Sequence, residues 1–503
     1  MIEPDFETFE RSYNAGEPQV VWTRLVADLE TPVSAMLKIA DGKPNSFLLE
    51  SVEGGETRGR YSIIGLKPDV IWRTMGDKPE INRKARSDAK AFEPVKEGAL
   101  KSLRSLIEES RIDLPEDLPP MAAGVFGYMG YDTVRLVEHL PDIPGGGLGL
   151  PDGIFLRPTI IAIFDSVKDE VTVVTPVRPE AGVNARAAYA RASERVSDVV
   201  SDFDRSLPHA EQMDQAVELP TPVSNTPADT YYEMVRKAKD YISAGDIFQV
   251  VLSQRFESPF TLPPFSLYRA LRRINPSPFL YFLNFEDFAI VGSSPEILVR
   301  VRDNRVTIRP IAGTRHRGKS ATEDAAIGEE LLADPKELAE HLMLLDLGRN
   351  DVGRVSKIGS VEVTEKFALQ FTSHLIHIVS NVEGDLAPEY DAIEALIAGF
   401  PAGTVSGAPK VRAMEIIDEL ELEKRGSYAG CVGYFSAAGE MDTCIILRTA
   451  VVKDCKMYVQ AGGGVVADSS PEGEHQESVN KAKALFRAAE EAVRYATRGG
   501  RRQ

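Results

Sequence analysis

The sequence predicts an α+β protein with large antiparallel or mixed β-sheets. Many short segments rich in β-branched and aromatic residues follow one another with only short turns between them. Such spacing favours antiparallel pairing over parallel units joined by crossover helices. A smaller number of longer segments carry apolar residues at helical spacing. We find no repeat of solenoid length and no low-complexity tract in the 503 residues.

The first part of the chain, 1–204, is predicted to mix strands with helices. Strands are expected at 46–50, 61–65, 70–73, 154–164 and 170–175, and helices at 97–109 and 185–203. The stretch 205–229 is polar and rich in proline, so it is the best linker candidate. Residues 230–498 then form a second region.

That second region is predicted to begin with a helix at 230–244, which ends at Gly245. Strands are expected at 247–256, 279–285, 289–292, 297–302, 306–310, 375–382, 430–437, 441–452 and 456–461. Further helices are expected at 390–398, 409–419 and 471–496.

The composition, 43% hydrophobic and 27% charged residues, is that of a globular protein. A net charge of −18 argues against nucleic acid or an anionic membrane as a partner. No apolar run is long enough to span a bilayer, and the acidic start is not a signal peptide. Three scattered cysteines favour a reducing compartment. We therefore expect a cytoplasmic protein.

Two pairs of glutamates are the most informative feature of the chain. Glu337 and Glu340 lie three residues apart in one predicted helix, and Glu474 and Glu477 repeat this spacing in another. Each pair therefore shares one helix face. Four carboxylates from two distant helices could hold one hard divalent cation, for which Mg²⁺ is the leading candidate. The alternative is two solvated helix faces, with Asp334 and Glu337 forming a variant capping box.

Three glycine-containing turns carry polar groups. They are RPIAGTRHRG at 309–318, GTVSGAPK at 403–410 and the glycine run at 461–464. The second leads into a predicted helix, whose free backbone N–H groups suit a carboxylate. The third lets a ligand approach the backbone closely. The alternative for each is a turn with no further role.

Together with GDIFQVVLSQRF at 245–256, NPSPFLYF at 275–282 and GSSPE at 292–296, these segments resemble the chorismate-utilising enzymes. The resemblance covers about 228–490 and is strongest to the anthranilate synthase component I family. It implies a sandwich of large antiparallel or mixed sheets flanked by helices. It also implies Mg²⁺-dependent conversion of chorismate and ammonia to anthranilate and pyruvate, the first committed step of tryptophan biosynthesis.

The resemblance assigns a role to each matched residue. The metal ligands would be Glu337, Glu340, Glu474 and Glu477. The substrate would contact Tyr428, Arg448, Gly462, Gly463, Gly464, Lys481, Lys410, Ala312, Gly313 and Thr314. The catalytic set would be Glu296, His377, Gln249 and Thr404. Glu296 would protonate the leaving hydroxyl, and His377, with a near-neutral pKa, would act in the elimination of enolpyruvate; a buried structural histidine is the alternative.

Two positions distinguish this chain from relatives with other products. Isochorismate- and salicylate-forming relatives carry a water-activating lysine where this chain has Gln249. Aminodeoxychorismate synthases typically carry a nucleophilic lysine where it has Ala312. Both differences favour anthranilate. Aminodeoxychorismate synthase and a non-catalytic tryptophan-binding regulator remain the alternatives.

The first region is expected to be regulatory, because its segment around Glu50 and Ser51 resembles the tryptophan feedback site of these enzymes. The inhibitor would also contact Pro278, Phe279, Leu280, Val432 and Tyr434. The chain has no recognisable glutamine amidotransferase domain after its last helix. We therefore expect a separate glutaminase subunit that supplies ammonia, and hence a hetero-oligomer.

Overall fold

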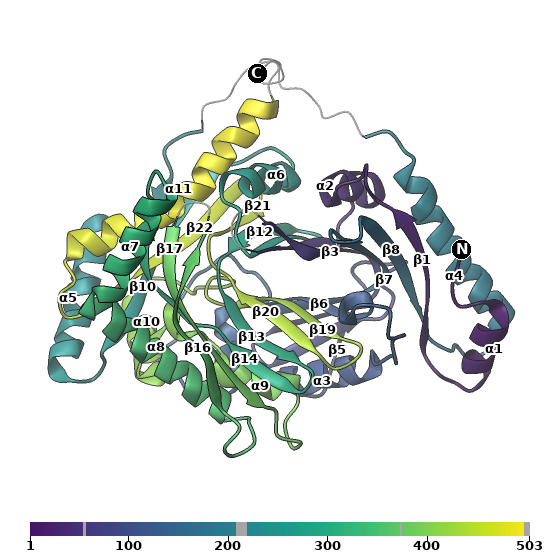
Figure 1. The fold of residues 1–503 in the computed structure, drawn as a ribbon, viewed down its shortest axis with the longest axis horizontal. Helices are drawn as coiled ribbons and strands as arrows, with labels where there is room; N and C mark the ends of the chain where they lie inside the picture. Colours follow the sequence, from purple (N-terminus) through teal and green to yellow (C-terminus); the bar gives the residue numbers. More distant parts are fainter. Residues whose placement is uncertain (54–56, 208–218, 373–374, 497–503) are drawn as a thin grey trace.

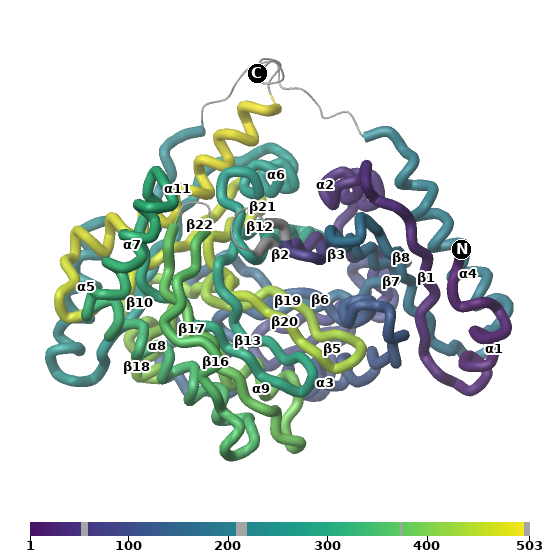
Figure 2. Tube along the Cα trace, viewed as in Figure 1, coloured from purple at the N-terminus to yellow at the C-terminus, as the bar shows by residue number. Residues whose placement is uncertain are grey.

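The structure is a computed structural model that describes residues 1–53, 57–207, 219–372 and 375–496. Within these ranges 22 strands join one continuous network, and every pairing between them is antiparallel. The network folds back on itself into two layers (Figures 1 and 2). The predicted antiparallel pairing is therefore confirmed.

The first layer runs through strands from both ends of the chain. In spatial order these are β1 (Gln19–Val26), β8 (Glu170–Val177), β7 (Gly153–Asp165), β3 (Thr57–Met75), β2 (Ser46–Glu53), β11 (Phe279–Asn284), β12 (Phe288–Ser294), β21 (Thr449–Lys453), β22 (Lys456–Val465) and β10 (Gln249–Pro259). The short strands β9 (Val223–Ser224) and β18 (Gly407–Ala408) pair with β10.

The second layer uses the other halves of the long strands β3 and β7. From β7 it continues through β6 (Gly124–Met129), β19 (Cys431–Ser436), β20 (Met441–Ile445), β13 (Ile297–Arg302), β14 (Arg305–Ile308) and β17 (Leu375–Asp385). Strands β15 (Ile311–His316) and β16 (Glu362–Phe371) also pair with β17, and β4 (Lys78–Asn82) and β5 (Glu93–Pro94) extend β3.

Side chains that alternate along the strands separate three large apolar cores, and a fourth, small one lies around Leu331, Ile376 and Ile378. On β11, Tyr281 and Leu283 face the space between the layers, whereas Leu280 and Phe282 face outward. Helices α1 (Phe6–Asn14), α4 (Ala185–Phe203), α6 (Pro264–Ile274) and α11 (Pro471–Ala496) cover the outer face of the first layer. Helices α3 (Ala99–Glu109), α8 (Pro335–Gly353) and α9 (Ala392–Gly399) cover that of the second. Helices α5 (Ala228–Ala244) and α10 (Lys410–Leu420) pack on β10 at the end of the first layer and belong to the same apolar core as α3, α8 and α9. This is the predicted sandwich flanked by helices.

Several elements differ from the predictions. Helix α1 and strands β1, β6 and β16 were not predicted, and the strands expected at 61–65 and 70–73 are one long strand, β3. The strand expected at 441–452 is two strands, β20 and β21, because the chain bends at Arg448.

The predicted linker, 205–229, is partly ordered. Strand β9 and the start of α5 lie inside it, while 208–218 lie outside the described residues. The two regions on either side share one sheet, since β2 pairs with β11 and β6 with β19. The division into 1–204 and 230–498 stays a prediction. None of the helices in the described ranges is both long and apolar enough to cross a bilayer.

Candidate active site

Glu296 and Thr404 form the buried centre of the candidate site. Glu296 lies in the turn between β12 and β13, and Thr404 lies in the 3-10 helix η4 (Gly403–Val405). The Thr404 hydroxyl lies 3.1 Å from both carboxyl oxygens of Glu296. Burial raises the pKa of Glu296 to about 8, against the opposing effects of the Thr404 hydrogen bond and the nearby Arg448 charge. Glu296 therefore holds a proton at neutral pH.

Arg448 supplies an uncompensated cation beside this acid. Its backbone φ of 47° is in the left-handed region, which is unfavourable for a residue with a side chain and is often found at functional sites. Burial lowers its pKa, and the Glu296 charge opposes this effect. Its guanidinium makes no hydrogen bond or ion pair with any other described residue. Such a group can bind an external carboxylate in bidentate fashion.

His377 lies on β17 next to the same arginine. Its Nδ1 is 3.1 Å from the Thr314 hydroxyl on β15, and a bulge at Gly313 (φ 71°) brings Thr314 opposite it. Burial, followed by repulsion from Arg448, lowers the pKa of His377 to about 4. The expected near-neutral pKa is therefore wrong, and the imidazole is uncharged at neutral pH.

The four glutamates come from α8 and α11, as the sequence predicts. The Asp334 side chain caps α8 by accepting hydrogen bonds from the backbone N–H groups of its first turn. Burial raises the pKa of Glu340, and the charges of Glu337 and Glu477 raise it further. Burial also raises the pKa of Glu474, with added repulsion from Glu477 and Glu340. The two helices therefore bring all four acids within electrostatic reach of one another.

The acids do not converge on a single point. No three carboxylate, imidazole or thiol groups in the described ranges lie close enough together to hold a metal ion. Glu337 pairs with Arg315 at 2.7 Å, and Glu477 pairs with Lys481 at 2.7 Å. The Oε2 atom of Glu474 is buried and has no hydrogen-bond partner among the described residues. Two of the acids are thus bound to protein cations, and the acid cluster retains excess negative charge.

The glycine run on β22 makes room for polar side chains from two other elements. A Cβ atom on Gly464 would lie 2.5 Å from Nε2 of Gln249, and one on Gly463 would lie 2.5 Å from Oε2 of Glu474. The same Gln249 Nε2 donates to Glu340 at 3.3 Å. These glycines therefore allow Gln249 and the acids to share one space.

The remaining contacts of this space come from Lys481 and from the β15 turn. The Lys481 ammonium donates to the Gly462 carbonyl at 2.9 Å. The backbone at Gly313 approaches Glu337, whose Oε2 would lie 3.2 Å from a Cβ at that position. Ala312, directly before it, is buried in the strand pair with β17. The metal and substrate candidates on β15, β22, α8 and α11 are thus neighbours.

Lys410 and Tyr428 are engaged elsewhere. Lys410 pairs with Asp351 at 2.8 Å, and both side chains are mostly buried. Asp351 lies 11 residues beyond Glu340 on α8, roughly 16 Å along the helix axis. Tyr428 precedes β19, where burial raises its pKa to about 12 and the guanidinium of Arg425 lies 5.4 Å from its ring. No contact among the described residues links either side chain to the acid cluster.

The residues expected to bind tryptophan do not all face one space, since some face the gap between the layers and others the outer side of the first layer. Ser51 pairs with Phe279 across β2 and β11, directly after the Pro278 turn. Phe279, Val432 and Tyr434 all belong to the core between the two layers. The side chains of Phe279, Val432 and Tyr434 therefore face the space between the layers.

Glu50 faces the other way. It pairs with Leu280, whose side chain belongs to the outer core. The Glu50 carboxylate accepts a hydrogen bond of 2.7 Å from Nε of Arg272 and another from the Tyr268 hydroxyl, both on α6. Because neighbouring residues on a strand point to opposite faces, Glu50 and Ser51 do not line the same space.

Two structural arginines were missed by sequence reasoning. Arg315 holds both Glu337 and Asp334, and its position directly after Gly313-Thr314 could have indicated a site residue. Arg425 is fully buried and donates to the carbonyls of Val405 and Val251, each at 2.7 Å.

The partner of Arg425 is Glu421, four residues earlier. Glu421 in turn accepts hydrogen bonds from the backbone N–H and hydroxyl of Ser253 on β10. The pair thus ties η4, which carries Thr404, to the strand that begins with Gln249. Their i,i+4 spacing was the available signal.

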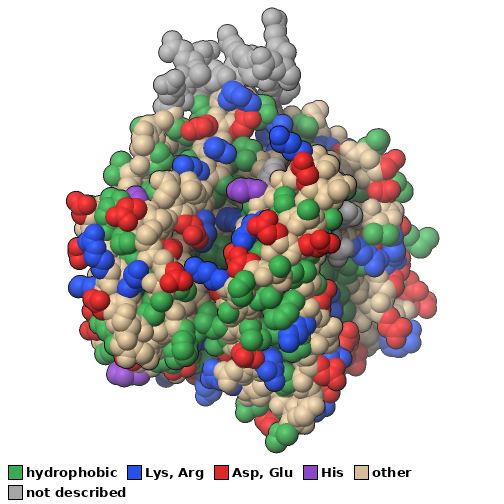
Figure 3. All heavy atoms as spheres, turned by 60° about the vertical axis from the view of Figure 1, so that its left-hand side comes forward, with side chains coloured by type: hydrophobic (Ala, Val, Ile, Leu, Met, Phe, Trp, Pro, Cys, Tyr) green, Lys and Arg blue, Asp and Glu red, His purple; other side chains and the backbone are tan. Residues whose placement is uncertain are grey.

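The side of the molecule that carries α5, α7 (Ala321–Ala333), α8 and α11 is hollowed. Figure 3 shows acidic, basic and histidine side chains around this hollow. Mixed charges at an opening are suited to a small charged substrate.

Comparisons with known proteins agree with this arrangement. The model of the chorismate binding enzyme family matches residues 45–487. Anthranilate synthase component 1 from Cereibacter sphaeroides is 61% identical over 495 residues, covering 98% of this chain and 99% of its own. The Aquifex aeolicus protein of the same name is 44% identical over 471 residues, covering 93% and 94%.

Solved structures give the same result. Anthranilate synthase component I from Streptococcus pneumoniae aligns with a TM-score of 0.75 and 38% identity, covering 85% of this chain and 92% of its own. The menaquinone-specific isochorismate synthase of Escherichia coli shares the fold, with a TM-score of 0.70 at 18% identity over 96% and 98% of the two chains.

Proposed function

The chain belongs to the chorismate binding enzymes and, within them, to the anthranilate synthase component 1 family, and we propose that it converts chorismate and ammonia to anthranilate and pyruvate. It is a chorismate-utilising enzyme of the lyase type. The observation that best supports this specific reaction is that Glu296 is protonated at neutral pH. Ammonia adds to the ring while a hydroxyl group leaves, and hydroxide leaves poorly unless an acid protonates it. A carboxyl whose pKa is about 8 provides that proton at neutral pH.

We assign Arg448 to substrate binding and His377 to the final elimination step. The unpaired Arg448 guanidinium would hold the pyruvyl carboxylate of chorismate beside Glu296. His377 is uncharged, so it can accept the proton removed from the ring when enolpyruvate leaves. Thr404 and Thr314 would orient Glu296 and His377 through the hydrogen bonds described above.

We propose that Glu337, Glu340, Glu474 and Glu477 hold Mg²⁺. The fit rests on four oxygen donors of like charge and on the unpartnered Oε2 of Glu474. It also rests on the pKa of Glu340 and of Glu474, which burial raises and the neighbouring carboxylates raise further. When bound, the ion would supply positive charge for a substrate carboxylate. Arg315 and Lys481 would have to release Glu337 and Glu477 if those acids become direct ligands.

A separate glutamine amidotransferase subunit is proposed to supply the ammonia, in the cytoplasm and within a hetero-oligomer. The support is the component 1 designation of the relatives, which concerns those proteins. Ammonium salts should then replace the subunit.

Feedback inhibition by tryptophan is proposed to act through Ser51 and Phe279. Phe279 pairs with Ser51 on one side and with Ser294 on the other. The Ser294 hydroxyl lies 3.4 Å from the backbone nitrogen of Glu296. An inhibitor that binds between the layers against Phe279 would therefore contact the strand next to Ser294, which lies two residues before the proposed acid Glu296. Glu50 faces the outer side of the sheet and is bound by Arg272, so a contact between Glu50 and an inhibitor between the layers requires its release and a change in the direction of its side chain.

The test is turnover of chorismate with ammonium and Mg²⁺, with products separated by chromatography and detected by fluorescence. Anthranilate and pyruvate in equal amounts are expected. Aminodeoxychorismate as the product would support the alternative synthase. Tryptophan binding by calorimetry without any turnover would support a non-catalytic regulator.

A further inference from the structure

A second cavity lies in the N-terminal region, away from the acids on α8 and α11. It has a volume of about 440 Å³ and is walled by β3, β7 and β8, by α4 and by the segment 83–87. Figure 1 shows α4 at the edge of the molecule opposite α8 and α11. This volume is within the range of small-molecule binding sites.

The cavity is strongly basic in a chain of net charge −18. Six arginines and one lysine line it, against only two carboxylates, Asp69 and Glu180. The arginines are Arg83, Arg86, Arg157, Arg178, Arg191 and Arg195. Since the rest of the protein carries excess negative charge, this grouping is a local feature and does not follow from overall composition.

Two of the arginines are neutralised by neighbouring acids. Arg157 forms a bidentate pair with Asp69, at 2.8 and 3.0 Å, and also contacts Glu109 at 2.7 Å. Arg83 forms a bidentate pair with the same Glu109, with both distances 2.7 Å. These contacts account for the wall next to α3.

The other four are not neutralised in this way. Arg178 donates to the Ser110 carbonyl and Arg195 to the Thr175 hydroxyl, both of which are neutral. The Nε atom of Arg178 is buried without a partner in the described part of the chain. Arg191 approaches Glu180 only to 3.9 Å, and Arg86 makes no hydrogen bond or ion pair with any described residue.

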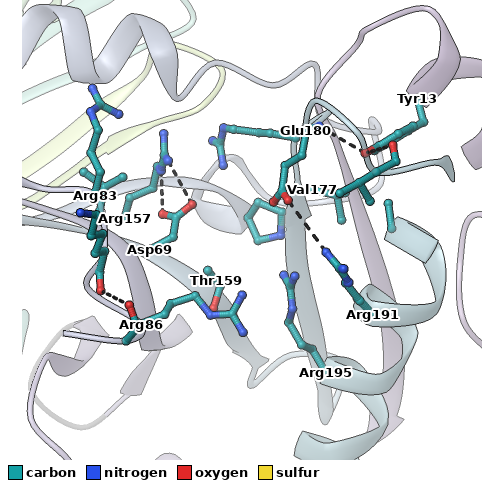
Figure 4. A pocket seen from close by; sticks show the side chains of 17 residues that line it. Tyr13, Asp69, Arg83, Arg86, Arg157, Thr159, Val177, Glu180, Arg191 and Arg195 are labelled. Carbon is teal, nitrogen blue, oxygen red and sulfur yellow. Dashed lines mark hydrogen bonds and ion pairs between the residues drawn. The ribbon is translucent and has the colours of Figure 1, made fainter. Parts of the chain in front are cut away.

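These guanidinium groups face one another across the cavity. Figure 4 shows Arg86 from the 83–87 segment and Arg195 from α4 turned toward the same space. Burial lowers the pKa of Arg195, and the Arg86 charge lowers it further. Burial and the charge of Arg157 lower the pKa of Arg178 to about 10. The cations therefore repel one another in the free protein, which is expected where an anion later binds among them.

We propose that this cavity binds a small organic phosphate that carries at least two phosphate groups. The planar guanidinium fork matches phosphate oxygens, and arginine dominates over lysine here. Cations approach from the 83–87 segment, from the end of β8 and from α4, so an anion with two phosphate groups can contact more of them than a single anionic group can. The proposed site is independent of the chorismate site and does not depend on the proposed reaction.

Calorimetry of the full chain with inorganic pyrophosphate, without Mg²⁺ and at constant ionic strength, tests this proposal. Each of Arg195→Gln and Arg191→Gln should weaken pyrophosphate binding about tenfold. Arg205→Gln is the matched control, because Arg205 follows α4, is exposed and pairs with Asp202 outside the cavity. It should bind as the wild type does. Equal affinity in all three variants and the wild type would overturn the proposal.

Binding of other anions tests which class of ligand the cavity prefers. Inorganic phosphate and citrate should bind at least tenfold more weakly than pyrophosphate; equal binding of either would refute the diphosphate class.

Thermal unfolding measures how much the repulsion between the arginines destabilises the free protein. Without anion, Arg195→Gln should raise the unfolding temperature, and pyrophosphate should stabilise the wild type more than this variant. Arg195 would have only a structural role if Arg195→Gln lowered the unfolding temperature without anion while pyrophosphate raised it by as much as in the wild type.

Discussion

The Thr404 hydroxyl lies 3.1 Å from both carboxyl oxygens of Glu296, although 108 residues separate the two in sequence. The hydroxyl donates to the carboxyl group and so favours its ionised form, while burial favours the protonated form. Burial dominates, because the pKa of Glu296 is raised to about 8. The contact therefore fixes the orientation of an acid that keeps its proton.

Anthranilate formation should decrease as the pH rises through about 8. Above this pH Glu296 loses the proton that it is proposed to donate. Glu296→Gln should lower kcat by roughly 10²–10⁴-fold and remove this alkaline limb. The measurement is kcat as a function of pH with ammonia concentration held constant, since ammonium itself titrates at alkaline pH.

Stability provides an independent check on the same group. The pKa of Glu296 is higher in the folded state than its ordinary value of 4.5, so the folded protein binds the extra proton between pH 4.5 and about 8. Its contribution to the free energy of unfolding must then decrease as pH rises across this window, by up to about 1.4 kcal/mol per pH unit. Glu296→Gln should lack this slope. An identical slope in both proteins would contradict the assigned pKa.

Thr404→Val should shift the alkaline limb to higher pH. Valine has nearly the shape of threonine but cannot donate a hydrogen bond, so the ionised form of Glu296 loses support. The pH dependence of kcat gives the shift directly, and Thr404→Ser should restore the wild-type profile. A limb that moves to lower pH would show that Thr404 stabilises the protonated form.

Glu340→Gln should abolish activity at ordinary Mg²⁺ concentrations and leave the fold intact. The same change should raise the unfolding temperature without metal, because it relieves the repulsion from Glu337 and Glu477. Mg²⁺ should then stabilise the wild type but not the variant. Asp346→Asn is the control, since Asp346 is an exposed acid on the same helix. Wild-type turnover in Glu340→Gln would refute the ligand assignment.

Local patterns predicted the elements and the shared faces but not how they meet. The spacing of Glu337 and Glu340 placed both on one face of α8. Helix α8 packs on β15 and β17 and helix α11 packs on β22, so the distance between their acids depends on how strands far apart in the sequence pair. Such pairing between distant segments leaves no mark in a local pattern.

Three details could not be predicted for the same reason. The run from Cys444 to Leu447 is continuously apolar and reads as the middle of a strand, so nothing local predicts the left-handed turn at Arg448. The low pKa of His377 arises from burial and from that arginine, which comes 71 positions later in the sequence. The outward direction of Glu50 is set by the register of β2 on β11, which a one-residue shift would reverse.

Arg425→Met should destabilise the protein by about 3–5 kcal/mol, because it leaves the Glu421 carboxylate buried without its partner. The double variant Arg425→Met/Glu421→Met should lose much less, since no uncompensated charge remains. Urea denaturation of the single and double variants measures the difference. The double variant should still have reduced kcat, because Arg425 also holds the Val405 carbonyl next to Thr404. If the double variant is as unstable as the single one, the contacts of Arg425 to the backbone, and not the paired charge, are what stabilise this region.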